Sequence, residues 1–349
     1  MNAMRRVPWL ALLLASVMLA LGAAACGGDD GNGGDEGAAD TATDEGGQSG
    51  ESIRVGLVTD IGGLNDRGFN QLAYQGLKQA ESDLNAEIKV LESQSDADYI
   101  PNLQQLAEDD YDLIISVGFL MTEATAKAAG AYPDVSFAII DSAFDPPIDN
   151  AQGILFKEQE AGYLVGYMAG LVTESGTVSS VGGQKIPPVD KFIAGFQKGA
   201  KDANPEVKTI NGYSQDFVDQ AKYKEVALEQ LSRGSDVVFQ VAGGCGLGAL
   251  DAAQQEDAWG IGVDADQAFL GEHVLTSALK RVNVAVFNVI ESVANGAFAG
   301  GGVTTFGLAE DGVGLGEVSA NAPEEAVAQT EAQVDKIIAG EVEIPETVG

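Results

Sequence analysis

The chain has 349 residues, with 53 acidic and 19 basic side chains, so its formal net charge is −34 at pH 7. This acidity excludes nucleic-acid binding, which requires a basic surface, and it argues against polyanionic substrates. The single histidine, His273, makes a histidine-rich zinc site implausible. We therefore expect no metal and no cofactor.

A lipoprotein signal peptide is predicted over residues 1–25. Two arginines precede an apolar run at 9–21, and three alanines at 23–25 form a small-residue cleavage site. Cys26 follows directly, and this order resembles the lipobox of exported bacterial lipoproteins, which implies lipidation of Cys26. The alternatives are an ordinary signal peptide with an incidental cysteine or a signal anchor, although the run is short for a membrane-spanning helix.

Residues 26–50 are predicted to form an acidic, glycine-rich linker. Almost all are Gly, Asp, Glu, Ala, Ser or Thr, which leaves too little apolar surface to offset the entropy of ordering. The linker would tether a folded body to the extracytoplasmic face of the bacterial cell membrane. Once Cys26 is lipidated, Cys245 has no partner in the chain, so we expect no intramolecular disulfide.

The body alternates apolar, strand-like runs with helical patterns, and the rhythm restarts after its first half. In the first half, strands are expected at 53–59, 88–91, 113–117 and 136–140, and helices at 70–84, 99–108 and 122–131. In the second, strands are expected at 153–156, 178–181, 207–213, 236–241, 259–263, 274–278 and 303–307, and helices at 158–173, 189–203, 220–231, 247–255, 282–296 and 323–339. This pattern predicts an α/β fold with two doubly wound lobes and parallel sheets.

Polar and glycine-rich residues cluster at the carboxyl ends of six predicted strands. They lie at 59–63, 116–118, 141–142, 181–183, 242–246 and 264–267. Open α/β sheets bind ligands beyond these strand ends. Glycines let the backbone approach a ligand closely, and helix N-termini present free N–H groups. The clusters predict a cleft between the lobes that binds a polar molecule.

The densest cluster extends from residue 59 into the first helix. Asp60 ends the first strand, Asn65 and Asp66 precede the helix, and Phe69 opens it. An aromatic ring beside carboxylates and amides suits a flat ligand that carries hydroxyls, because stacking contributes about 0.5–1.5 kcal/mol beyond burial. An N-cap role for Asp66 and a core role for Phe69 stay open.

Five segments carry a resemblance to a known family. They are TDIGGLNDRGFNQLAYQG (59–76), VGGQKIPPVDKFIAGFQKGAK (181–201), VAGGCGLGALDAA (241–253), GVDADQ (262–267) and LTSALKRVNVAV (275–286). In this order they resemble the basic membrane protein family of bacterial ABC-transporter substrate-binding lipoproteins, and the match covers 53 to about 318.

The resemblance implies a type I periplasmic-binding-protein fold, with two Rossmann-like lobes joined by three hinge crossovers. Lobe 1 would comprise residues 51–156 plus about 282–320, and lobe 2 residues 157–281 plus about 321–349. It further implies a monomer that binds a nucleoside, with a purine as the expected base, and passes it to an ABC permease. No catalytic residues are implied.

Site residues are carried over from the family one by one. Phe69 would stack on the base, Asp264 would accept hydrogen bonds from ribose hydroxyls, and Lys280 would lie nearby. Asp60, Asn65 and Asp141 would contact base or sugar edges. Gly243 and Gly244 would leave space for the nucleoside.

Some positions stay open. For a second stacking aromatic the candidates are Phe217, Phe239 and Trp259, and Phe217 is preferred because its loop should face the crevice. Cys245 stands where the family often has threonine, and we expect a buried, inert thiol there. Asp266 and Gln267 belong to a family motif, and packing or N-capping roles are equally compatible with them.

Three alternative functions remain. The cleft could bind another small polar ligand such as a pentose, or the protein could be the ligand-sensing partner of a membrane receptor. An enzyme with a dinucleotide at GGCGLG (243–248) is a further alternative, but this turn is not a true GxGxxG. Arg67 and Arg281 alone do not make a phosphate pocket, so nucleosides are favoured over nucleotides.

Overall fold

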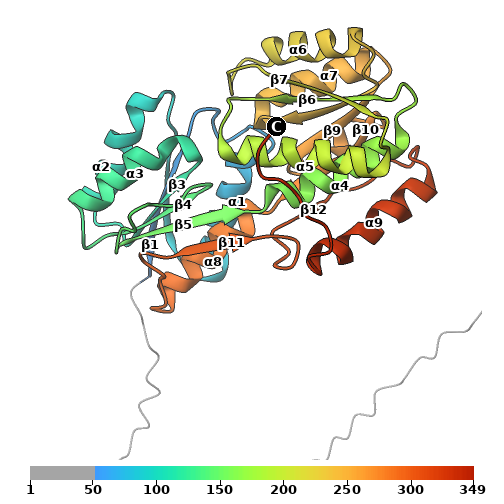
Figure 1. Cartoon of the computed structure of the whole chain (residues 1–349). Coiled ribbons are helices and arrows are strands. Elements are labelled where there is room, and N and C mark those ends of the chain that lie inside the picture. The colour runs from blue at the N-terminus through green and yellow to red at the C-terminus, as the bar shows by residue number, and fades with distance from the viewer. Residues whose placement is uncertain (1–51) are drawn as a thin grey trace, which may run out of the picture. The chain divides into compact units, whose positions relative to one another are not determined.

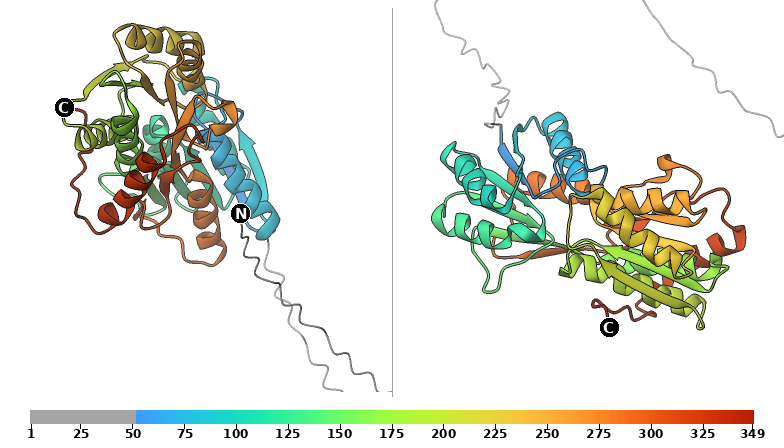
Figure 2. Two further views of the ribbon diagram at one scale, coloured as in Figure 1. Left: turned by 90° about the vertical axis from the view of Figure 1, so that its right-hand side faces the viewer. Right: turned by 90° about the horizontal axis from the view of Figure 1, so that it is seen from above.

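The computed structural model describes residues 52–349, and the predicted signal peptide, Cys26 and the linker lie outside the described residues. The described chain forms two six-stranded sheets, each with helices on both faces (Figures 1 and 2). Within this part of the chain, no helix has both the length and the apolar character that a membrane span requires.

The first sheet is parallel throughout and has the order β11-β5-β4-β3-β1-β2. Its strands are β1 (Arg54–Thr59), β2 (Glu87–Leu91), β3 (Leu113–Val117), β4 (Ser136–Ile140), β5 (Ala151–Phe156) and β11 (Val303–Phe306). Its helices are α1 (Phe69–Asp83), α2 (Tyr99–Glu108), α3 (Thr122–Ala131) and α8 (Val282–Ala294). Leu57 and Val58 of β1 belong to different apolar clusters, because successive side chains of a strand point to opposite faces. The sheet is therefore buried on both faces, with α1 and α8 on one and α2 and α3 on the other (Figure 1).

The second sheet has the order β12-β10-β9-β8-β6-β7, with five parallel strands and the antiparallel strand β12 at its edge. Its strands are β6 (Thr177–Gly182), β7 (Lys208–Tyr213), β8 (Val237–Val241), β9 (Trp259–Asp264), β10 (Val274–Lys280) and β12 (Val313–Leu315). Its helices are α4 (Glu158–Val172), α5 (Pro187–Ala203), α6 (Gln220–Ser232), α7 (Leu247–Gln255) and α9 (Glu324–Ile338). The order β5-β4-β3-β1-β2 in the first sheet corresponds to the order β10-β9-β8-β6-β7 in the second. Strands β4 and β9 therefore occupy equivalent positions in the two sheets.

Helices α4 and α5 pack backbone against backbone. A Cβ atom at Gly166 would lie 2.1 Å from the carbonyl oxygen of Phe196, and one at Gly199 would lie 2.1 Å from that of Tyr163. Only glycine permits this approach on both helices. The packing holds the N-terminal half of α5 at the end of the sheet where β6 and β8 finish.

The chain crosses between the sheets three times, as the family resemblance implied. It passes from β5 to α4 through Lys157, from β10 to α8 through Arg281, and from β11 to β12 through residues 307–312. The crossings are bonded to one another: the N–H of Lys157 donates to Phe306 O at 2.9 Å, and that of Arg281 to Gly312 O at 2.8 Å.

Strand β12 is the one departure from the expected order of strands. The sequence assigned residues 282–320 as a block to lobe 1, whereas β12 pairs antiparallel with β10 in the second sheet. Three residues are too few to show a strand's alternating pattern, so this pairing becomes visible only in the folded chain. Strand β12 was not predicted, whereas all the predicted strands and helices are present, with ends that shift by a few residues.

Candidate functional site

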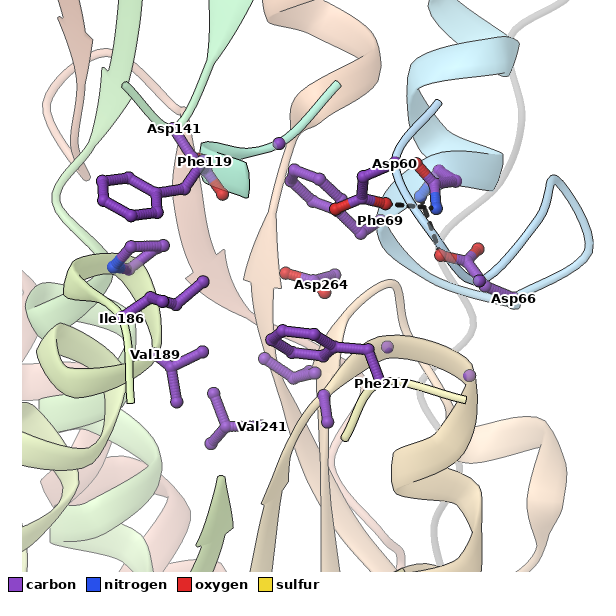
Figure 3. A pocket seen from close by; sticks show the side chains of 18 of the residues that line it. Asp60, Asp66, Phe69, Phe119, Asp141, Ile186, Val189, Phe217, Val241 and Asp264 are labelled. Atoms are coloured by element: carbon purple, nitrogen blue, oxygen red, sulfur yellow. Dashed lines mark hydrogen bonds between the residues drawn. The ribbon is translucent and has the colours of Figure 1, made fainter. Parts of the chain in front are cut away.

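A cavity lies where the carboxyl ends of the two sheets' strands face each other (Figure 3). The volume of the cavity is about 80 Å³, and about 640 Å³ when the open space at its mouth is included. Most of the predicted site residues line it, namely Asp60, Phe69, Asp141, Phe217, Gly243, Gly244, Asp264 and Lys280. Its wall also contains Asp66, for which the sequence left a ligand role open, and residues that the sequence did not single out as ligand contacts, among them Asn70, Phe119, Ile186, Val189 and Phe192.

Asn65 is the predicted site residue that the structure places elsewhere. It is exposed and does not belong to the cavity wall, whereas the neighbouring Asp66 is buried and does. Asp66 accepts backbone hydrogen bonds from Gly68 and Gln71, both at 3.0 Å, and from Asn70 at 2.8 Å. The carboxylate thus caps the first turn of α1, which is the alternative that the sequence left open.

Four phenylalanine side chains line the cavity, and one of them, Phe192, comes from α5. Phe69 and Phe217 were predicted, and Phe119 joins them from the short 3-10 helix η2 (Phe119–Met121) that follows β3 (Figure 3). Phe217 packs on Gly183, where a Cβ atom would lie 2.1 Å from the ring. The polar cluster at 116–118 predicted that a strand ends just before Phe119. It did not predict that the Phe119 ring faces the cavity.

The other two candidates for a second stacking aromatic do not reach the cavity. Phe239 is fully buried in the core, with its ring centroid 5.3 Å from that of Phe196. Trp259 opens β9 and therefore lies at the opposite end of that strand from Asp264. The preferred candidate, Phe217, is the one of the three that lines the cavity.

Lys280 joins the two lobes through a buried ion-pair cluster. Its Nζ lies 2.7 Å from Asp141 Oδ2 of the first lobe and 3.0 Å from Glu158 Oε1 at the start of α4. The same atom lies 5.1 Å from the ring centroid of Phe69. Burial alone lowers the pKa of Lys280, but the carboxylates of Asp141, Glu158 and Asp264 outweigh it and raise that pKa. The ammonium therefore stays charged and orders the cavity wall, and the sequence did not identify Glu158 as its partner.

Asp141 and Asp264 occupy equivalent positions at the ends of β4 and β9. Both have left-handed backbone angles, with φ of 69° and 65°, a strained conformation that clusters at functional sites. Burial raises the pKa of Asp264 to about 7, although Lys280 opposes the shift. Among the described residues, no group donates a hydrogen bond to the Asp264 carboxylate, so its oxygens can accept from a ligand.

Asp60 lies on the wall formed by the first lobe. Its Oδ1 accepts a hydrogen bond of 3.0 Å from Asn70 Nδ2, and its backbone N–H donates to Val117 O at 3.2 Å. Gly118 has φ of 117°, and a Cβ atom there would lie 2.4 Å from Asp60 Oδ2. Burial raises the pKa of Asp60 to about 8.

Gly243 and Gly244 bring the lobes together at one edge of the cavity. A Cβ atom at Gly244 would lie 3.0 Å from Asp66 Cα, and one at Gly68 would lie 3.6 Å from Gly243 Cα. Because they have no side chain, these glycines allow the backbone of the opposite lobe to approach closely, and they also line the space in which a ligand would lie. The next glycines turn away from the cavity: a Cβ atom at Gly246 would meet the side chain of Gln240 at 1.7 Å.

The remaining motif residues have structural roles. Cys245 is buried, its Sγ lies 3.1 Å from Ala242 O, and burial raises its pKa to about 12, as expected for an inert thiol. Asp266 Oδ1 accepts from the N–H of Ala268 at 3.1 Å. Gln267 is fully buried and accepts from Gln240 Nε2 at 2.9 Å. Packing and capping account for both motif positions.

Comparisons with known proteins identify the family. Residues 53–348 match the family described as ABC transporter substrate-binding protein PnrA-like. The chain is 35% identical to the CD4+ T-cell-stimulating antigen of Listeria innocua, over 97% of each protein. It is 33% identical to the ABC transporter nucleoside-binding protein BmpA of Lactococcus lactis, over 84% of this chain and 89% of that one.

A solved structure agrees with this relationship. The ABC transporter solute-binding protein of Aeropyrum pernix superimposes with a TM-score of 0.78 at 29% identity, over 85% of this chain and 94% of that one. This confirms the predicted periplasmic-binding-protein fold and a binding rather than an enzymatic family. The chain therefore belongs to the PnrA-like family of ABC transporter substrate-binding proteins.

Proposed function

We propose that the protein binds a nucleoside, with a purine as its base, in the cavity between the lobes. The observation that carries this proposal is the meeting of the Phe69 and Phe217 rings with the open Asp264 carboxylate in one cavity. A nucleoside combines a flat heterocycle, which can stack on the phenylalanine rings, with vicinal hydroxyls, which can donate to the Asp264 carboxylate. The relative from Lactococcus lactis is named as a nucleoside-binding protein, which supports the same ligand class.

The contacts available in the cavity are sufficient for useful affinity. Stacking on an aromatic ring contributes about 0.5–1.5 kcal/mol beyond burial. A hydrogen bond from a ribose hydroxyl to a carboxylate such as Asp264 contributes about 1.5–3 kcal/mol. Two or three such bonds, together with stacking and apolar burial, can give a dissociation constant in the micromolar range or below. A micromolar dissociation constant corresponds to a binding free energy of about −8 kcal/mol.

The charge of the cavity favours a neutral ligand. Four aspartates line it, Asp60, Asp66, Asp141 and Asp264, and Lys280 is its only lining cation among the described residues. That lysine already pairs with Asp141 and Glu158. A phosphate group would therefore find no free cationic partner among the described residues that line the cavity. Nucleosides rather than nucleotides fit this arrangement.

We further propose that the protein works from a lipid anchor on Cys26 at the extracytoplasmic face of the cell membrane. There it would act as a monomer and pass its ligand to an ABC permease. The membership of the family of ABC transporter substrate-binding proteins supports the permease as partner. The lipobox-like sequence before Cys26 supports the anchor.

Calorimetric titration tests the ligand. The purified body, residues 51–349, is titrated with adenosine, guanosine, inosine, uridine, AMP and ribose. We expect heat from the purine nucleosides and at least tenfold weaker binding of AMP, an energy difference of about 1.4 kcal/mol. Heat from ribose with none from any nucleoside would contradict the proposal and favour a pentose.

A further inference from the structure

Arg67 and Phe269 meet across the two lobes, outside the cavity. Arg67 precedes α1 in the first lobe, and Phe269 lies in the short 3-10 helix η4 (Ala268–Leu270) that follows β9 in the second. The guanidinium carbon of Arg67 lies 5.6 Å from the centroid of the Phe269 ring, a distance at which cation–π attraction operates. Both residues line an outer groove together with Leu72 and Asp266, and neither belongs to the wall of the cavity. The contact therefore joins the lobes without entering the space for the ligand.

The Arg67 guanidinium has no carboxylate partner in the described part of the chain. The other arginines within residues 52–349 each form an ion pair, namely Arg54 with Glu87, Arg233 with Glu229 and Arg281 with Asp311. Phe269 is 62% exposed, and it belongs to none of the apolar clusters of the described residues. Neither side chain is thus accounted for by its own lobe, and the contact between the lobes is the specific interaction that both share.

Local hydrogen bonds hold both loops in place. Arg67 has a left-handed φ of 52°, a conformation that persists only where the surrounding structure imposes it. Here the Asp66 carboxylate accepts from the N–H of Gly68 at 3.0 Å and fixes the turn around Arg67. In the second lobe, the Asp266 carboxylate accepts from the N–H of Ala268 at 3.1 Å. Each partner is therefore positioned by its own lobe, and the contact forms when the lobes come together.

Both loops begin at residues that line the cavity. Asp66 directly precedes Arg67, and Asp264 ends β9 just before the loop that carries Phe269. A ligand that contacts both lobes favours the closed state, and a contact made only in that state favours it too. Because the two act on one equilibrium, breaking the outer contact should shorten the time for which the ligand stays bound.

We propose that Arg67 and Phe269 form a latch across the outer edge of the cleft, which stabilises the closed state and slows ligand release. This inference goes beyond the identity of the ligand, and it rests on the proposed function only in that the cleft binds one. Cation–π contacts at exposed sites are weak, so loss of the latch should accelerate release by about two- to fivefold. Association starts from the open state, in which the pair is apart, so the association rate should not change.

A double-mutant cycle measures the latch. The body, residues 51–349, receives a donor and an acceptor dye at Glu123→Cys of α3 and Glu225→Cys of α6, two exposed positions on different lobes. Adenosine-loaded protein is mixed in a stopped-flow instrument with excess unlabelled body, which traps released ligand, and energy transfer reports the opening of the lobes. Arg67→Gln and Phe269→Leu should each raise the dissociation rate constant about two- to fivefold. The double variant should show no further increase, because either substitution alone already breaks the contact.

Two features of the chain make this comparison specific. Arg233→Gln is the matched control, since it removes the same charge but breaks only the pair with Glu229 within the second lobe. It should keep the wild-type dissociation rate. Cys245 is buried, so the dyes react at the introduced thiols. Phe269→Leu retains an apolar side chain without an aromatic face, which separates a cation–π contact from apolar packing.

Each outcome decides between the claims. Wild-type dissociation rates in Arg67→Gln and Phe269→Leu would overturn the latch and leave nucleoside binding intact. Additive increases in the double variant would also overturn it, because the two side chains would then act separately. Faster release from Arg67→Gln with a wild-type rate in Phe269→Leu would exclude the aromatic contact. If no nucleoside binds the wild type, the proposed function fails, and ribose replaces adenosine in the same test of the latch.

Discussion

At the scale of single residues, the cavity is built from side chains whose local conformations are costly. Asp141 and Asp264 adopt left-handed backbone angles, and carboxylates are buried beside one another. Strained backbone angles and closely spaced buried carboxylates persist only where the surrounding structure stabilises them, and they cluster at ligand-binding and catalytic sites. The lysine cluster at Lys280 neutralises part of this charge, but its partners are already in place.

The stacking and hydroxyl contacts lead to the first prediction. Phe69→Ala and Asp264→Ala should each weaken nucleoside binding by at least about tenfold, because they remove the ring surface and the free carboxylate. Phe144→Ala is the control, since Phe144 packs in an apolar cluster of the same lobe and does not line the cavity. Calorimetry and circular dichroism check affinity and fold together. Wild-type affinity in both site variants would contradict the assignment.

The buried carboxyl of Asp60 leads to a prediction about pH. Burial raises its pKa to about 8, with smaller contributions from Asp66, Asp141 and Asp264, while Asn70 opposes the shift. Above the ordinary pKa and up to about pH 8, the folded protein holds a proton that the unfolded chain has released, so stability falls as the pH rises. Asp60→Asn should lose less unfolding free energy between about pH 5 and about pH 8 than the wild type.

Urea denaturation of the ligand-free body at both pH values measures this difference. Groups distant from the cavity titrate equally in the two proteins, so the difference between them reports residue 60 together with its interaction with Asp66, Asp141 and Asp264. Equal losses in the wild type and in Asp60→Asn would show that this carboxyl does not retain its proton in the folded state.

At the scale of elements, the α4–α5 contact positions one wall of the cavity. The N-terminal half of α5 supplies Val189 and Phe192 to that wall. Its place depends on glycines that let the two helix backbones touch. The contact therefore links helix packing in the second lobe to the shape of the site.

Gly166→Ala tests this link. Its Cβ atom would lie 2.1 Å from Phe196 O, so the helices must separate, and such overpacking costs about 1–3 kcal/mol. Gly130→Ala is the control, because Gly130 lies in α3 with no atom within 4 Å of the added Cβ. That change should stabilise the protein by about 0.5–1 kcal/mol through helix propensity. Chemical denaturation would contradict the argument if Gly166→Ala were as stable as the wild type.

At the scale of the whole molecule, three crossings join the lobes, and the loops at Asp66 and Gly244 lie in close contact. We expect the crossings to act as hinges and this contact to limit how closely the lobes approach. Gly244→Ala should hold the lobes slightly apart, because its Cβ atom would lie 3.0 Å from Asp66 Cα. We expect affinity for the nucleoside to fall by about three- to tenfold while each lobe remains folded. Gly314→Ala, whose added Cβ meets no atom within 4 Å, is the control.

Small-angle X-ray scattering with saturating ligand complements the affinity measurement. The wild type and Gly314→Ala should show the same ligand-induced decrease in radius of gyration, and Gly244→Ala a smaller one. A full decrease together with unchanged affinity in Gly244→Ala would show that this contact does not limit closure.

The predicted lipid anchor at Cys26 would determine where the whole molecule is located. Cys26→Ser removes the thiol that would carry the lipid, so the protein should leave the membrane fraction and appear in the medium or periplasm. Fractionation with an antibody against the body measures this. Persistent membrane association of the variant would indicate an uncleaved signal anchor.

The sequence by itself determined the series of strands and helices and most of the site. Apolar residues recur with the period of the element that buries them, so a strand or a helix can be predicted from its own residues. The carboxyl ends of parallel strands meet at one edge of a sheet. Asp60, Asp141 and Asp264 could therefore be assigned to the cavity from their positions alone, and they line it.

Only the tertiary structure decided which side chains reach that edge and which lobe some segments join. Whether Asn65 or Asp66 faces inward depends on the turn before α1, and the pairing of Lys280 with Glu158 depends on a crossing between the sheets. Phe119 and strand β12 likewise follow from contacts between distant segments. Local patterns record how each segment is buried, but not which distant segment covers it, because long-range packing selects among many locally equivalent arrangements.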